Sequence, residues 1–131
     1  ASDVYKRQTL DCACVDLFTG RCAFYKAGAP RSYVLRHGRL TRCELASMPA
    51  GILRGITFAK RTAVLGAGDT VVLLSDGITD ADAVGLEALL CRFQSQDQQE
   101  LADTVLAYAK AHTPADRRDD MSVIVARLLP N

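Results

Sequence analysis

The sequence predicts an α+β domain in which strands come first, two helices follow and one strand closes the chain. Three observations predict it: short strand-like segments separated by turn residues up to residue 74, apolar residues at helical spacing after it, and a last apolar segment of strand length. Because tight turns join consecutive strands, we expect mainly antiparallel sheet layers. The 131 residues, 49% hydrophobic and 24% charged, suit one globular domain.

Two β-hairpins begin the pattern. Their strands and turns are, in order, Leu10–Leu17, Thr19-Gly20 and Cys22–Tyr25, then Ser32–Arg36, His37-Gly38 and Arg39–Glu44. Residues 1–8 do not fit the alternation that begins at Thr9, so we interpret them as a leader that is not native to the domain.

A loop, a strand, a tight turn and a second strand come next. They are Met48-Pro49-Ala50-Gly51, Thr57–Leu65, Gly66-Ala67-Gly68-Asp69 and Thr70–Leu74. The Thr70–Leu74 strand is mostly apolar, has the length of a buried strand and leads directly into Ser75-Asp76-Gly77.

Two segments with apolar residues at helical spacing follow, the first at Val84, Leu86, Leu89, Leu90 and Phe93, the second at Leu101, Val105, Leu106 and Ala109. For the second helix we predict Asp97 as the N-cap, with Glu100 completing a capping box, and an end at His112-Thr113-Pro114.

Met121–Leu128 is the last predicted strand. Val123, Ile124 and Val125 are apolar without a break, which is typical of a strand buried on both faces inside a sheet. We therefore expect Leu73, Val123 and Val125 to be almost fully buried.

The charge balance and the cysteines narrow the functional classes. A net charge of +1 provides no strong field for nucleic acid or an acidic membrane surface, and Arg36, Arg39 and Arg42 predict a solvated hairpin edge.

Five cysteines without framework spacing argue against a secreted disulfide scaffold. Cys12 and Cys14 share one strand face and with Cys22 could imitate part of a zinc site, but small buried side chains in a reducing cytoplasm are the favoured interpretation.

Acidic residues stand at the ends of two apolar strands. Asp76 follows Thr70–Leu74, and Asp119 and Asp120 precede Met121–Leu128. Each motif alone is typical of a turn or a solvated loop. Carboxylates that converge from separate strand ends would instead make a hard-oxygen site suited to Mg²⁺ or Mn²⁺.

Taken together and in this order, the motifs resemble those of the metal-dependent PPM (PP2C-like) serine/threonine phosphatases, and of their SpoIIE subfamily in particular. The segments that carry the resemblance are Leu73–Asp80, Asp119–Val125, Gly66–Asp69, Asp11–Gly20, Gly28-Ala29-Pro30 and Met48–Ile52. It covers almost all of Thr9 to Leu129 and implies that residues 9–131 are the C-terminal part of such a domain, within a PP2C-like β-sandwich flanked by helices.

The resemblance also implies roles for single residues. Asp76 and Asp119 would be metal ligands, with Ser75, Gly77 and Asp120 supporting them, and Gly51 would belong to a structural loop. Members of the family hydrolyse phosphomonoesters with water activated by two Mn²⁺ or Mg²⁺ ions. The substrate would be a cytoplasmic phosphoprotein such as a phosphorylated anti-sigma-factor antagonist, in bacterial signalling of the sporulation type.

One departure from the family pattern is large. The family's N-terminal half carries an Asp-Gly motif that bridges both metals, and no second Asp-Gly occurs here before Asp76. We therefore expect a fragment that is inactive by itself, with the activity in the intact protein, which upstream segments could anchor to a membrane. The alternative is a non-catalytic, phosphatase-like binding module in an anti-sigma-factor partner-switching system. A nucleotide-binding α/β domain is disfavoured because no Gly-rich phosphate loop follows a first strand.

Overall fold

The computed structural model describes residues 9–44 and 59–130. The predicted leader at 1–8 and the loop around Gly51 lie outside the described residues. The chain divides into two compact units, residues 1–29 with 43–66 and residues 30–42 with 67–131. Each unit contains one sheet, and every strand pairing with a recorded register is antiparallel, which confirms the predicted α+β class.

The first unit holds a three-stranded sheet in the order β1-β2-β5, formed by Leu10–Val15, Arg21–Ala27 and Ala59–Val64. The β1–β2 hairpin is the first predicted hairpin. Gly20 in its turn has a φ of +77°, and a Cβ there would lie 2.2 Å from the carbonyl oxygen of Leu65. Only glycine fits such a turn without strain.

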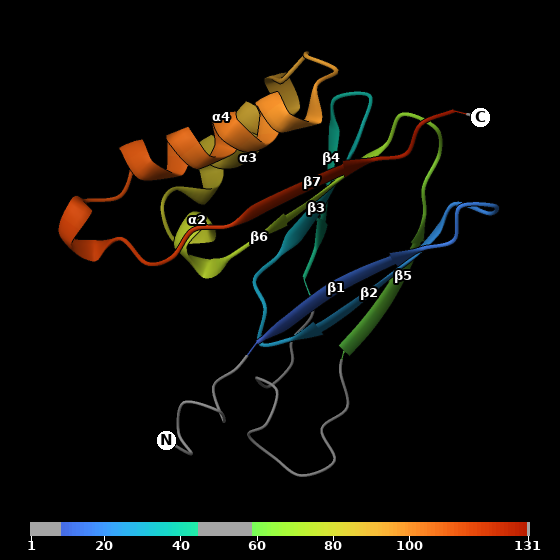
Figure 1. Ribbon diagram of the computed structural model, residues 1–131, viewed down its shortest axis with the longest axis horizontal. Coiled ribbons are helices and arrows are strands. Elements are labelled where there is room, and N and C mark those ends of the chain that lie inside the picture. The colour runs from blue at the N-terminus through green and yellow to red at the C-terminus, as the bar shows by residue number, and fades with distance from the viewer. Residues whose placement is uncertain (1–8, 45–58, 131) are drawn as a thin grey trace, which may run out of the picture. The chain divides into compact units, whose positions relative to one another are not determined.

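The second unit holds a four-stranded sheet in the order β4-β3-β6-β7 (Figure 1). Its strands are β3 (Ser32–Arg36), β4 (Arg39–Cys43), β6 (Thr70–Leu74) and β7 (Val123–Arg127). The second predicted hairpin and the Thr70–Leu74 strand are confirmed. β6 and β7 are adjacent in this sheet, and in the sequence all the helices of the described residues lie between them.

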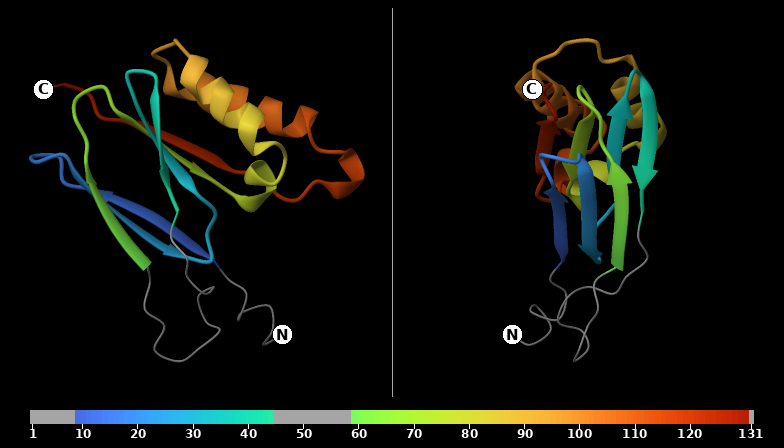
Figure 2. Two further views of the ribbon diagram at one scale, coloured as in Figure 1. Left: turned by 180° about the vertical axis from the view of Figure 1, so that it is seen from behind. Right: turned by 90° about the vertical axis from the view of Figure 1, so that its right-hand side faces the viewer.

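The helices lie over one face of this four-stranded sheet (Figures 1 and 2). They are α2 (Asp76–Thr79), α3 (Ala83–Arg92) and α4 (Gln98–Ala111), followed by a 3₁₀ turn at Ala115–Arg117. The core between helices and sheet consists of Tyr33, Val72, Leu74, Ile78, Leu86, Leu90, Leu101, Val105 and Ala109. The two longer helices were predicted, whereas α2, a single turn, was not.

The start of α4 confirms one part of the predicted cap and corrects another. The Asp97 side chain accepts hydrogen bonds from the backbone N–H groups of Gln99 and Glu100, at 2.9 and 3.4 Å. The Glu100 carboxylate, however, accepts from the Ser95 hydroxyl, and this hydroxyl in turn accepts from the Asp97 N–H. Ser95 thus stands between the two members of the expected capping box.

The predicted burial of the last strand is wrong. Among the described residues β7 pairs with β6 alone, and Ile124 is 60% exposed. Val123 and Val125 pack partly buried against the helix-covered core, and Leu73, the register partner of Ile124, is half-buried as well. The core residues of β6 are instead Val72 and Leu74. The unbroken apolar run therefore belongs to a strand at the edge of the described sheet, and an apolar run of this length is compatible with an edge strand as well as with a central one.

Candidate metal site

The pairing of β6 with β7 brings the two acidic motifs to one end of the sheet. Leu74 at the end of β6 pairs with Val123 at the start of β7. Ser75 and Asp76 therefore leave the sheet where Asp119 and Asp120 approach it. Asp76 is the first residue of α2, and all three aspartates are exposed. The exposed carboxylates and the antiparallel register give a strand-end acidic cluster.

Ser75 links the two motifs by hydrogen bonds. Its backbone N–H donates to the Ser122 carbonyl at 3.0 Å, which continues the β6–β7 ladder beyond Leu74. Its hydroxyl accepts from the Ser122 N–H at 2.8 Å and lies 3.2 Å from the Asp120 carbonyl oxygen, to which it donates. These bonds fix the position of the Asp119–Asp120 segment relative to Asp76.

Gly77 allows the two backbones to approach closely. A Cβ on this buried residue would lie 2.5 Å from the Asp120 carbonyl oxygen and 3.2 Å from that of Asp119. Both contacts are to backbone atoms, which cannot rotate away as a side chain can. A glycine is required here because any side chain would push the Asp119–Asp120 segment outward.

The electrostatics of Asp76 show that several negative charges share this region. Although Asp76 is exposed, the protein around its carboxyl removes part of the hydrating water, which raises the pKa of this carboxyl above the ordinary value, and the charges of Asp80 and Asp119 raise it further. Asp80 lies four residues after Asp76, one helical turn on, and was not among the predicted site residues. An Asp-x-x-x-Asp spacing across a short helix would have been the signal for it.

This donor set suits a hard cation. Carboxylate oxygens are the ligands preferred by Mg²⁺ and Mn²⁺, and a cation would relieve the repulsion among the carboxylates. Within residues 9–44 and 59–130, no group of three or more His, Cys, Asp or Glu side chains is placed to hold an ion. Since Mg²⁺ is commonly held through one or two carboxylates and keeps several waters, the Asp76 and Asp119 carboxylates fit part of such a site.

The second unit contains ion pairs that the sequence did not predict. Arg36 forms an ion pair of 2.6 Å with the nearly inaccessible carboxylate of Asp69. Arg42 binds Glu87 with Nε at 2.7 Å from Oε2, and this hydrogen bond is the main reason that the pKa of Glu87 falls to about 2. Two of the three arginines expected on a solvated edge therefore bind acidic partners.

The cysteines are in two different environments. The Sγ atoms of Cys12 and Cys14 lie 3.8 Å apart, which confirms that they share a face of β1. Cys22 and Cys43 are buried as expected. Cys12 is half-buried, and the expectation of burial is wrong for Cys14 and Cys91, which are exposed. Cys22 pairs with Val15 rather than with Cys12 or Cys14 in the β1–β2 register and belongs to the opposite face.

The comparison with known families decides the classification. The stage II sporulation protein E (SpoIIE) family matches residues 3–129. The chain belongs to the SpoIIE family. A SpoIIE relative, stage II sporulation protein E of Bacillus subtilis strain 168, is 26% identical over 126 residues, which are 92% of this chain and 15% of that protein. The family resemblance found in the sequence is thereby confirmed.

Solved SpoIIE structures agree with this assignment. The Mn-presoaked phosphatase domain of SpoIIE from Bacillus subtilis matches with a TM-score of 0.80 and 26% identity, over 95% of this chain and 57% of that one. The PP2C phosphatase domain of the same protein with a fragment of its regulatory domain matches with a TM-score of 0.82 and 26% identity, over 91% of this chain and 38% of that one. The chain thus spans somewhat over half of the solved phosphatase domain and about a seventh of the full-length relative.

Proposed function

We propose that the intact protein to which this chain belongs is a metal-dependent protein serine/threonine phosphatase, with Asp76 and Asp119 among its metal ligands. The observation that carries the proposal is the shared acidic end of β6 and β7, where the pairing of Leu74 with Val123 brings the Asp76 and Asp119 motifs together. Membership of the SpoIIE family and the likeness to its phosphatase domain support the same activity.

In this proposal two Mn²⁺ or Mg²⁺ ions serve the intact enzyme. Such ions lower the pKa of a bound water and stabilise the charge that develops during in-line attack on phosphorus. The residues of this chain would bind and position the ions. The Asp76 and Asp119 carboxylates would be ligands, and the hydrogen bonds of Ser75 with the Asp120 carbonyl and the Ser122 N–H hold the two aspartate segments in place. Gly77 lets the two segments meet without displacing either.

We further propose that this chain by itself is inactive. The Asp76 and Asp119 carboxylates can hold one ion, whereas two ions are needed to stabilise both the attacking and the leaving oxygen. The chain spans 57% of the solved SpoIIE phosphatase domain, and the other metal ligands would come from the remainder of that domain. Binding of a single ion should be weak because few protein oxygens replace its water.

The proposed substrate is a phosphoserine or phosphothreonine protein in the cytoplasm, with a phosphorylated anti-sigma-factor antagonist as the first to test. Among the described residues, none of the helices combines the length and the apolar character that a bilayer-spanning segment requires. With a net charge of +1, the chain offers no strong field for nucleic acid, which the proposed function does not involve.

The test is Mn²⁺-dependent hydrolysis of a phosphoserine peptide by the chain alone and by the intact protein. We expect activity from the intact protein, a loss of at least about 100-fold in Asp76→Asn and Asp119→Asn, and no change in Asp116→Asn, an exposed control close to Asp119. Full activity in Asp76→Asn would remove Asp76 from the site. An inactive intact protein that still binds a partner would favour the non-catalytic binding module.

A further inference from the structure

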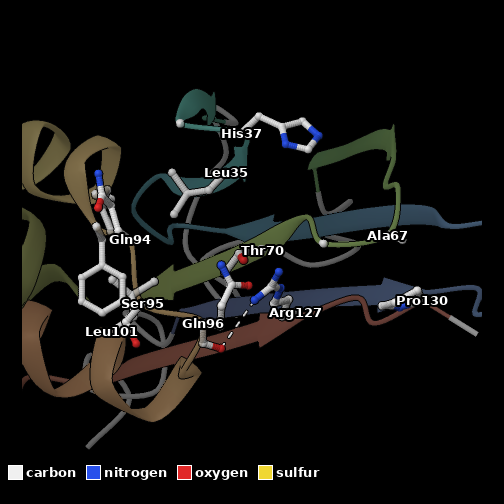
Figure 3. A pocket seen from close by; sticks show the side chains of 14 residues that line it. Leu35, His37, Ala67, Thr70, Gln94, Ser95, Gln96, Leu101, Arg127 and Pro130 are labelled. Atoms are coloured by element: carbon white, nitrogen blue, oxygen red, sulfur yellow. Dashed lines mark hydrogen bonds between the residues drawn. The ribbon is translucent and has the colours of Figure 1, made fainter.

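A cavity of about 480 Å³ lies at the other end of β6 and β7 from the acidic cluster (Figure 3). Thr70, which begins β6, and Arg127, which ends β7, both line it and are register partners. Four residue steps of about 3.3 Å separate Thr70 from Leu74, so the Thr70–Arg127 pair is about 13 Å from the strand ends that carry Asp76 and Asp119. All its described lining residues belong to the second unit.

Arg127 brings a positively charged guanidinium to this cavity. Its Nε is shielded from solvent and has no hydrogen-bond partner, and the bond from Nη1 to the Gln96 carbonyl is long, at 3.5 Å. Within the described part of the chain no carboxylate forms an ion pair with it. A guanidinium has five N–H donors and stays charged at all physiological pH values, so its Nη groups have donors left for a ligand beyond the one long bond to Gln96.

The rest of the wall supplies apolar surface and a few polar groups. Leu90 and Leu101, both nearly inaccessible, and Leu35 belong to the apolar part, and Thr70 is the register partner of Arg127. In Figure 3 the side chains of Thr70, Gln96 and Arg127 lie together. No acidic side chain is among the described residues of the lining. The cavity therefore combines apolar surface with convergent polar groups, and its volume is within the range of small-molecule sites.

We propose that this cavity binds a small organic anion, an apolar body carrying a carboxylate or a phosphate monoester. The oxyanion accepts hydrogen bonds from the Nη groups of Arg127 and from Thr70, since a guanidinium matches both headgroups through two parallel N–H donors. The apolar body rests on Leu35, Leu90 and Leu101. The site is separate from the proposed metal site and stands whether or not the phosphatase assignment holds.

The experiment is a titration of the ¹⁵N-labelled 131-residue chain, in EDTA, followed by NMR. The probes are phenylacetate, phenyl phosphate and the uncharged phenylacetamide. We expect at least one anion to shift the resonances of the Arg127 Nε–H and of the Gly68 and Thr70 amides. The affinity of this anion should be at least about tenfold higher than that of phenylacetamide. Preferred binding of phenylacetate or of phenyl phosphate identifies the headgroup as a carboxylate or a phosphate monoester. EDTA keeps cations from Asp76, so phenyl phosphate cannot bind there through a metal.

Variants separate charge from shape. Arg127→Gln should weaken anion binding at least about tenfold and leave phenylacetamide unchanged, and Arg127→Lys should retain part of the affinity. Gln94→Trp, at an exposed lining position, should obstruct the cavity while keeping its charge. The dispersion of each NMR spectrum reports whether the variant folds. Equal binding of phenylacetate, phenyl phosphate and phenylacetamide, or anion binding that survives both Arg127→Gln and Gln94→Trp, overturns the proposal.

Discussion

The two ends of the β6–β7 strand pair differ in charge and in construction. At one end Asp76, Asp80 and Asp119 place negative charges close together, and Ser75 and Gly77 hold the backbones in contact. At the other end the Arg127 guanidinium faces a cavity, and none of the described carboxylates forms an ion pair with it. The acidic end depends on strand register, whereas the cavity depends on turns and loops. A short pair of strands can therefore keep sites of opposite charge apart on one sheet.

The strand pair itself gives the largest expected effect. Leu74→Ala should lower the free energy of unfolding by roughly 2–5 kcal/mol, because Leu74 is buried in the core under the helices. Leu73→Ala, one residue away on the half-buried face, should cost about 1 kcal/mol. Urea denaturation of both variants measures the difference. Equal costs would mean that the helix-covered face is not the principal core.

The close backbone contact gives the next largest effect. Gly77→Ala should cost roughly 1–3 kcal/mol and weaken Mn²⁺ binding, because its Cβ would lie 2.5 Å from the Asp120 carbonyl oxygen. Thr79→Ala, on the same short helix, should cost less than about 1 kcal/mol, since it removes one hydroxyl that lies 3.3 Å from the Asp76 carbonyl. Thermal denaturation with and without Mn²⁺ compares the two. A Gly77→Ala variant as stable as the parent would refute the close packing of the two segments.

The acidic end could be predicted from the sequence, and the cavity could not. An apolar strand followed by Asp-Gly, and Asp-Asp followed by an apolar strand, are local patterns that place Asp76 and Asp119 at strand ends. The single turn of α2 is too short to show a helical period. Arg127 looks like any polar residue at the end of a strand, and its cavity combines residues from the 37–38 turn, the 66–69 turn and the 93–96 segment. Contacts among such distant segments leave no local pattern.

Removing one charge from the acidic end should change the free energy of unfolding least, and this substitution should stabilise the fold. Because the pKa of Asp76 is raised in the folded chain, the fold loses stability as pH increases from the ordinary Asp value through the raised one. Asp76→Asn should therefore stabilise the metal-free chain at pH 7 and abolish that pH dependence, and because water screens this exposed carboxylate the gain should be less than about 1 kcal/mol. Denaturation in EDTA between pH 4 and pH 7 measures it. A less stable Asp76→Asn chain would show that the carboxylate is favourably bound rather than repelled.

The central claim is that Asp76 and Asp119 bind one cation at their end of the strand pair. The most direct measurement is paramagnetic broadening of the amide NMR signals of the 131-residue chain by substoichiometric Mn²⁺. We predict the strongest broadening at residues 75–80 and 118–122 and little at Thr70 and Arg127. Asp76→Asn and Asp119→Asn should each remove it, and Asp116→Asn should not. Broadening centred elsewhere, or unchanged in both Asp76→Asn and Asp119→Asn, would contradict the claim.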